Sequence, residues 1–176
     1  IVTGAGRGIG AATARLMSQH GANVVVSDLD KEPSDSVAAE IRRDGGKAIS
    51  VHGDVTDRAF PDAIMKAAVE KFGKLNILVN NVGYTWDGVI QKTTDEQWNA
   101  IIDVHLRAPF KILRAASEFI RAASKKEAEA GQEVFRKVVN ISYIAGLGGK
   151  AGQANYSAAK AGIIGLTLAL AKEWGR

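Results

Sequence analysis

The sequence contains no cysteine, only three prolines and few aromatic residues, which make up 6% of its 176 positions. Without cysteine there are no disulfides and no thiolate metal ligands. The histidines His20, His52 and His105 lie far apart and show no ligand spacing, so we expect no metal site. No apolar run is long enough to span a bilayer, and no secretory signal is visible. We expect no membrane association and a cytoplasmic location, although organelle targeting cannot be judged because Ile1 is expected to lie inside the first strand.

The composition is that of an ordinary soluble globular protein, with 46% hydrophobic and 24% charged residues. The length suits one domain with one core, which we expect to cover residues 1–176. The net charge is +4. Basic pairs such as Arg42-Arg43 and Lys125-Lys126 are scattered among acids, which predicts a solvated surface and no nucleic-acid partner. A positive rim that attracts an anionic substrate carrier is a milder alternative.

Strand and helix patterns alternate along the chain. The expected strands include one that ends at Val2 and four that cover residues 22–27, 48–52, 75–79 and 138–142. The expected helices cover residues 9–21, 31–44, 57–72, 94–101, 104–123 and 155–174. This alternation predicts an α/β fold, a doubly wound parallel sheet of the Rossmann type. Pro109 should kink or restart its helix, and the charged residues 124–133 should extend that helix and then form a solvated loop.

A glycine-rich segment, residues 3–10, follows the first expected strand. Glycine permits unusual backbone dihedrals and lets the main chain approach a pyrophosphate. The next helix offers its N-terminal amides and the positive end of its dipole to that anion. The segment therefore predicts a dinucleotide cofactor, bound by Gly4, Arg7, Gly8, Ile9 and Gly10.

Asp28 lies 20 residues after Gly8, at the end of the second expected strand. A carboxylate there can accept both ribose hydroxyls of NAD, and it would repel the 2′-phosphate of NADP. Arg7 favours NADP instead, because a basic residue in the glycine loop can hold that phosphate. We give Asp28 the greater weight and expect NAD rather than NADP. The alternative is that Asp28 is only a turn or cap residue.

Tyr156 and Lys160 are four residues apart in an expected helix and so share one face. A free phenol loses its proton near pH ~10, and a nearby ammonium lowers that pKa by favouring the phenolate. Tyr156 could then exchange a proton with a substrate oxygen near neutral pH. The pair predicts acid–base catalysis beside a dinucleotide that gives or takes hydride.

These motifs resemble those of the short-chain dehydrogenase/reductase family, in family order and along nearly the whole chain. Gly4, Gly8 and Gly10 match its Thr-Gly-x-x-x-Gly-x-Gly turn, and Tyr156-x-x-x-Lys160 matches its catalytic signature. Residues 80–83, Asn-Asn-Val-Gly, resemble its Asn-Asn-Ala-Gly, and residues 140–142, Asn-Ile-Ser, resemble the strand before its active site.

The resemblance also implies roles for single residues. Lys160 would hold the nicotinamide ribose in addition to tuning Tyr156. Asp54 and Val55 would contact the adenine, and Asn80 would line the path of the cofactor. His105 aligns with the family's catalytic asparagine, and some relatives also carry histidine there.

The family's catalytic serine lies thirteen residues before the tyrosine, and Tyr143 occupies that position. Ser142 is one residue early, and neighbouring side chains on a strand point to opposite faces. Three interpretations stay open. Tyr143 offers its own hydroxyl to the substrate, or the chain is a low-activity form, or Ser142 serves after a local rearrangement of the strand end.

Residues 152–162 look most like 3-oxoacyl-thioester reductases and hydroxyacyl-CoA dehydrogenases. The resemblance implies an oxidoreductase of fatty acid metabolism that interconverts a secondary alcohol and a ketone, with a 3-oxoacyl or 3-hydroxyacyl thioester as substrate. The alternatives are a steroid or small-alcohol dehydrogenase, and a catalytically weakened nucleotide-binding subunit. Family members usually associate, which implies a homodimer or homotetramer. Relative to the family, we expect parts of both ends to be absent, including the C-terminal substrate loop and the last strands.

Overall fold

The computed structural model describes residues 1–175, which group into two compact units. The first unit comprises residues 1–82 and 111–139, and the second comprises residues 83–110 and 140–175. The expectation of a single domain over residues 1–176 stays a prediction.

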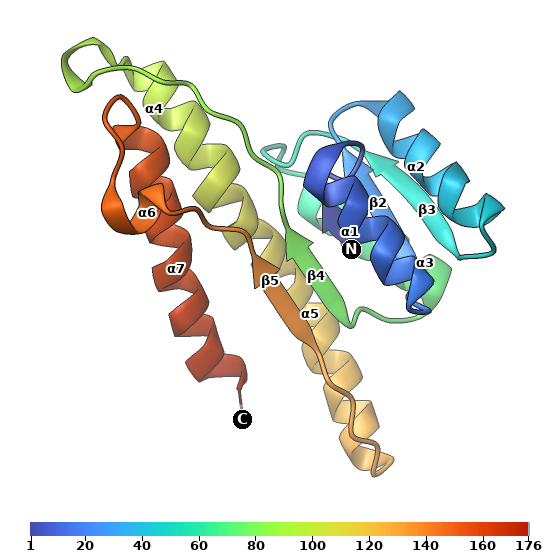
Figure 1. Ribbon diagram of the computed structural model, residues 1–176. Coiled ribbons are helices and arrows are strands. Elements are labelled where there is room, and N and C mark those ends of the chain that lie inside the picture. Colours follow the sequence, from blue (N-terminus) through green and yellow to red (C-terminus); the bar gives the residue numbers. More distant parts are fainter. Residues whose placement is uncertain (176) are drawn as a thin grey trace. The chain divides into compact units, whose positions relative to one another are not determined.

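The first unit is built on a five-stranded parallel sheet with the strand order β3-β2-β1-β4-β5 (Figure 1). The strands are β1 (Val2–Thr3), β2 (Val24–Asp28), β3 (Ala48–His52), β4 (Ile77–Asn80) and β5 (Lys137–Asn140). Its helices are α1 (Gly8–Gln19), α2 (Lys31–Arg43), α3 (Phe60–Phe72) and most of α5 (Ala108–Glu129).

The two faces of this sheet are covered by different helices. On one face, Val24 and Val26 pack in a buried cluster with residues of α1 and α2. Val25 lies between them, so its buried side chain points to the opposite face. The strand order reverses after β3, and right-handed crossovers therefore put α3 on that opposite face, where its Ile64 and Met65 are completely buried. The predicted doubly wound α/β fold is confirmed.

The second unit is helical. It contains η1 (Ile90–Lys92), α4 (Asp95–Ile102), the π-helical turn η2 (Asp103–Arg107), α6 (Ala145–Gly148) and the long α7 (Ala154–Trp174). Helix α7 is in contact with α4, η2 and α6, and Figure 1 shows α6 beside its first half. Two glycines permit this proximity: a Cβ on Gly162 would lie 2.8 Å from a methyl carbon of Leu106, and one on Gly146 would lie 2.6 Å from the carbonyl carbon of Lys160.

The chain departs from the predicted element bounds mainly around Pro109. The expected helix 104–123 is divided, because residues 103–107 form the π-turn and α5 begins at Ala108. Pro109 thus lies in the first turn of α5, directly after the π-turn, and the backbone stays helical through that turn. The disturbance predicted at Pro109 therefore takes the form of a π-turn before it. Helix α5 continues to Glu129 and ends in a turn at Gly131, as expected for the charged segment. The expected strand 138–142 ends at Asn140, and α6 was not anticipated.

Among residues 1–175, no helix combines the length and apolar character needed to cross a membrane. The same residues contain no group of three or more histidine, aspartate or glutamate side chains that could hold a metal ion.

Candidate active site

The glycine-rich segment forms the turn between β1 and α1 in the first unit. Gly4 and Gly8 have φ of +62° and +53°, a region that L side chains rarely adopt. A Cβ on Gly10 would lie only 2.1 Å from the carbonyl oxygen of Gly4. The turn thus requires glycine at all three positions.

Asn81 fixes this turn to the end of β4. Its Nδ2 donates to the carbonyl oxygens of Thr3 and Gly4, both at 3.0 Å, and its backbone N–H donates to the Thr3 hydroxyl at 3.1 Å. Asn80 was the residue predicted to line the cofactor path, and Asn81 had no predicted role. The available signal was a second amide directly after a strand that neighbours β1.

The start of α1 suits an anion. In α1, which is described over its whole length, no side chain caps the first turn and no acidic residue lies in it. Its first amides and the positive end of its dipole therefore face an approaching phosphate without competition from a carboxylate on the same turn. Strands β1 and β4 are neighbours, so the turn also lies at the switch point of the sheet, where open α/β folds bind ligands. The residues present fit a dinucleotide pyrophosphate.

Asp28 is the last residue of β2, and its carboxylate faces the glycine turn. Oδ2 accepts the backbone N–H of Gly6 at 2.8 Å, and Oδ1 accepts that of Asp30 at 3.3 Å. A carboxylate offers about four lone-pair positions, so two such bonds leave capacity for ribose hydroxyls. Arg7 does not contact this carboxylate through a hydrogen bond; its Nη1 donates to Asp30 Oδ2 at 2.8 Å.

Three more predicted cofactor residues lie at the ends of strands: Asp54 and Val55 shortly after β3, and Asn80 as the last residue of β4. Asp54 Oδ1 accepts the backbone N–H and the hydroxyl of Thr56, at 2.8 and 2.7 Å, and so closes a local turn. Val55 and Asn80 are buried. The adenine contact by Asp54 and Val55, and the position of Asn80 along the cofactor path, stay predictions.

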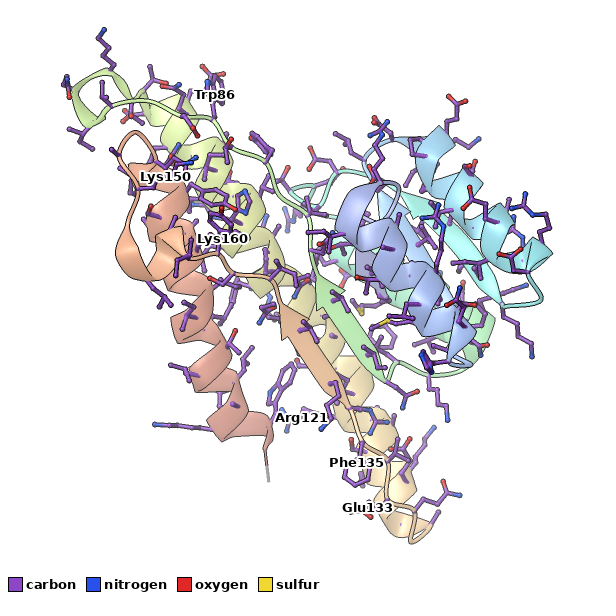
Figure 2. The ribbon with its side chains drawn as sticks, viewed as in Figure 1. Trp86, Arg121, Glu133, Phe135, Lys150 and Lys160 are labelled. Carbon is purple, nitrogen blue, oxygen red and sulfur yellow. The ribbon has the colours of Figure 1, made fainter. Side chains whose placement is uncertain are left out.

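The predicted acid–base pair lies in the second unit, one turn apart on α7. Lys160 is only 5% exposed. Its Nζ donates to the carbonyl oxygen of Ile141 at 2.6 Å, on the segment that leads into α6 (Figure 2), and lies 5.6 Å from the ring centroid of Tyr156. Burial lowers the pKa of Lys160, since desolvation disfavours the ammonium.

The pKa of Tyr156 is raised, not lowered as the Lys160 pairing predicted. Partial burial is the larger cause, and the neighbouring Tyr143 phenol is the second. The ammonium of Lys160 is bonded to a backbone carbonyl instead of the phenol oxygen, which explains why it does not offset them. Tyr156 is therefore held as the neutral phenol, the form that donates a proton.

Ser142 and Tyr143 are directed to different neighbours. The Ser142 hydroxyl donates to the carbonyl oxygen of Lys160 at 2.8 Å, within the backbone of α7. Tyr143 is 53% exposed, and its ring centroid lies 6.1 Å from that of Tyr156 in an edge-on arrangement. Tyr143 is thus the residue beside Tyr156, and Ser142 is bonded to α7. Their catalytic roles stay predictions.

His105 projects from the π-turn and is almost completely buried. Its ring lies edge-on to Tyr156 at 4.9 Å between centroids. Nε2 lies 2.7 Å from the carbonyl oxygen of Tyr84 and 3.2 Å from its backbone nitrogen; Nδ1 is buried and has no hydrogen-bond partner among the described residues. Burial first, and the Lys160 charge second, lower the pKa of His105 to about 4. His105 is therefore neutral near pH 7.

The loop 84–89 is joined to the start of α7 by hydrogen bonds of side chains for which the sequence predicted no role. Gln153 Nε2 donates to both carboxylate oxygens of Asp87, at 3.1 and 2.9 Å. Asn155 Nδ2 donates to the carbonyl oxygens of Trp86 and Gln97, at 3.1 and 3.2 Å. The amide Oδ1 of Asn155 accepts the N–H of Tyr156. Both amides come shortly before the catalytic motif, and this position was the signal available for them.

A family model described as short chain dehydrogenase matches residues 1–176. The chain is 44% identical over 181 residues to the hydroxyacyl-CoA dehydrogenase ChsB1 of Mycobacterium tuberculosis, which covers 100% of this chain and 56% of the relative. It is 40% identical over 174 residues to a 3-oxoacyl-[acyl-carrier-protein] reductase of Synechocystis, over 98% of this chain and 66% of the relative.

A crystal structure of a short chain dehydrogenase from Mycobacterium avium superposes with a TM-score of 0.92 at 41% identity, over 99% of this chain and 62% of that one. The chain thus spans about three fifths of the length of these relatives. The fold, the glycine turn and the family match agree: the chain belongs to the short-chain dehydrogenase/reductase family, an enzyme family of oxidoreductases that use nicotinamide dinucleotides. The preference between NAD and NADP, the oligomeric state and the compartment stay predictions.

Proposed function

We propose that the protein carrying this chain is an NAD(H)-linked oxidoreductase that interconverts 3-oxoacyl and 3-hydroxyacyl thioesters. The observation that carries the chemistry is the buried Lys160 one helical turn from Tyr156, with His105 and Tyr143 against the same phenol. The substrate class is supported by the printed names of the relatives, a hydroxyacyl-CoA dehydrogenase and a 3-oxoacyl-[acyl-carrier-protein] reductase.

Each residue has a defined task in this proposal. The nicotinamide, when bound, supplies or accepts the hydride at the substrate carbon. Tyr156 Oη gives a proton to the substrate oxygen in reduction and takes it back in oxidation. Its raised pKa keeps the phenol protonated, which suits reduction. Lys160 donates to the carbonyl oxygen of Ile141, just after β5, and its remaining N–H groups would hold the nicotinamide ribose.

The cofactor preference rests on Asp28. Its carboxylate would accept the ribose hydroxyls of NAD and repel the 2′-phosphate of NADP. Replacing Asp28 with alanine should narrow the difference between NADH and NADPH binding by about 1–3 kcal/mol, the scale of one unpaired polar contact. Tighter binding of NADPH than NADH by the unaltered protein would contradict the proposed preference.

The direct test is turnover of acetoacetyl-CoA with NADH by the intact protein, followed by nicotinamide absorbance. A small ketone and a steroid ketone serve as matched substrates for the alternative dehydrogenase classes. We expect the thioester to be reduced fastest. Faster reduction of either unactivated ketone would reject the acyl-thioester proposal and leave the oxidoreductase class intact.

A second candidate function, a nucleotide-binding subunit with weakened catalysis, is favoured by the bonding of Ser142. Its hydroxyl donates to a backbone carbonyl of α7, and Tyr143 occupies the family's serine position beside Tyr156. The two candidates differ in one measurement. Saturable NADH binding without turnover of any of the three ketones would favour the subunit.

A further inference from the structure

We propose that Asp30 is a second determinant of the NAD preference, because it engages the guanidinium of Arg7 that would otherwise serve the 2′-phosphate of NADP. The proposal rests on the proposed use of NAD(H). It concerns only residues of the first unit, and its test is the binding of dinucleotides.

Asp30 occupies the N-cap position of α2 without capping that helix. An aspartate at this position ordinarily accepts a backbone N–H of the first turn. Here no cap hydrogen bond is formed by its side chain. The carboxylate instead accepts Arg7 Nη1 at 2.8 Å, across 23 residues of sequence. The side chain is thus turned from its local partner to a distant cation.

The pair is joined to Asp28 from both sides. Gly6, next to Arg7, donates its backbone N–H to Asp28 Oδ2, and Asp30 donates its own to Asp28 Oδ1. A Cβ on Gly6 would lie 2.8 Å from Pro33 Cβ and 2.9 Å from Asp28 Oδ2, so a larger residue would push the turn away from this carboxylate. Arg7 and Asp30 therefore flank the carboxylate that is proposed to hold the ribose.

The charges at this place explain how Asp30 would act. Asp28 and Asp30 contribute two negative charges and Arg7 one positive charge, so the group is net negative when Arg7 is paired. A 2′-phosphate would meet that net negative charge and a guanidinium that is already bonded to a carboxylate through Nη1. Neutralising Asp30 would leave one carboxylate, that of Asp28, and one unpaired guanidinium, that of Arg7, a combination that accepts a phosphate more readily.

The test is a double-mutant cycle on the intact protein, with NADH and NADPH dissociation constants measured by nicotinamide fluorescence. The variants are Asp30→Asn, Arg7→Gln and the double variant. Asparagine is as good an N-cap residue as aspartate, so Asp30→Asn removes the charge without weakening the start of α2. Asp44→Asn, which removes an exposed carboxylate paired with Arg43 after the last turn of α2, controls for net charge.

We expect Asp30→Asn to tighten NADPH binding by roughly 5-fold, the upper end for an exposed ion pair, and to change NADH binding by less than about 2-fold. In the Arg7→Gln background the same substitution should change NADPH binding by less than about 2-fold. Asp44→Asn should leave both constants within about 2-fold.

An equal gain in both backgrounds would overturn the proposal, because Asp30 would then act by repulsion alone. No gain with Arg7 present would also overturn it. If the unaltered protein prefers NADPH, the NAD assignment is wrong, whereas an Arg7-dependent gain would still support the pairing. Failure to bind either dinucleotide would overturn both.

Discussion

The two units hold their site residues by different means. Around Asp28 in the first unit, the paired side chains of Arg7 and Asp30 are 66% and 54% exposed. In the second unit, His105, Gln153, Asn155 and Lys160 are each at most 5% exposed, and most of their bonds are to backbone groups. Exposed ion pairs are weak and screened by salt, whereas buried polar groups are costly to leave unpaired. Changes near Asp28 should therefore alter which cofactor binds, and changes around Tyr156 should alter stability and rate.

The glycine turn is the rigid exception in the first unit, and Gly10→Ala gives the largest expected effect. Its Cβ would meet a backbone oxygen at 2.1 Å, which cannot move without the turn. We expect the free energy of unfolding, measured with urea, to fall by at least about 3 kcal/mol. Gly165→Ala is the matched control, because Gly165 is also helical and a Cβ there meets nothing within 4 Å. That change should stabilise the protein by about 0.5–1 kcal/mol. Similar changes in the free energy of unfolding for the two variants would contradict a clash at position 10.

Tyr156→Phe tests the chemistry of the second unit. It removes the transferable proton and keeps the ring that packs on His105. Turnover should fall at least ~100-fold, which corresponds to about 2.7 kcal/mol. NADH affinity, measured by fluorescence, should stay within about 3-fold. Retention of most of the turnover would refute the role of Tyr156 as acid and base.

His105 makes the stability of the second unit sensitive to acid. Its folded-state pKa of about 4 lies below the ordinary value of ~6.5, so the unfolded chain binds the proton more readily. The stabilising contribution is fully present above pH ~6.5 and is lost as the pH falls toward 4. The free energy of unfolding, measured with urea, should fall between pH 7.5 and pH 5 by about 2 kcal/mol less in His105→Asn than in the unaltered protein. Identical pH profiles for the variant and the unaltered protein would show that His105 does not titrate in this range.

Tyr143→Ser should raise turnover about 10-fold, equivalent to about 1.4 kcal/mol, because a compact donor would stand at the family's serine position. Ser142→Ala should leave turnover nearly unchanged and reduce stability by about 1 kcal/mol, the value of one hydrogen bond. Lower turnover of Tyr143→Ser would indicate that the Tyr143 hydroxyl donates a hydrogen bond to the substrate oxygen. Loss of activity in Ser142→Ala would instead assign that role to Ser142.

The sequence predicted the sheet and the glycine turn because these depend on local signals. Val24 to Val26 indicate a buried strand, and glycine at positions 4, 8 and 10 meets a backbone requirement that no other residue meets. The tertiary contacts could not be read in this way. The bond of Lys160 to Ile141 joins positions 19 apart, and that of Gln153 to Asp87 joins positions 66 apart. The raised pKa of Tyr156 was missed because spacing along a helix gives proximity but not the direction of an ammonium.

The attachment of loop 84–89 to α7 also has a consequence for hydrogen exchange. The Gly88 N–H donates to the carbonyl oxygen of Gly152, just before the helix begins. Residues 84–89 form neither helix nor strand apart from the single bridge between Gly88 and Gln153. The Gly88 amide can therefore reach solvent deuterium only when its bond to Gly152 opens. It should exchange at the rate of the first turn of α7, as part of one locally unfolding segment.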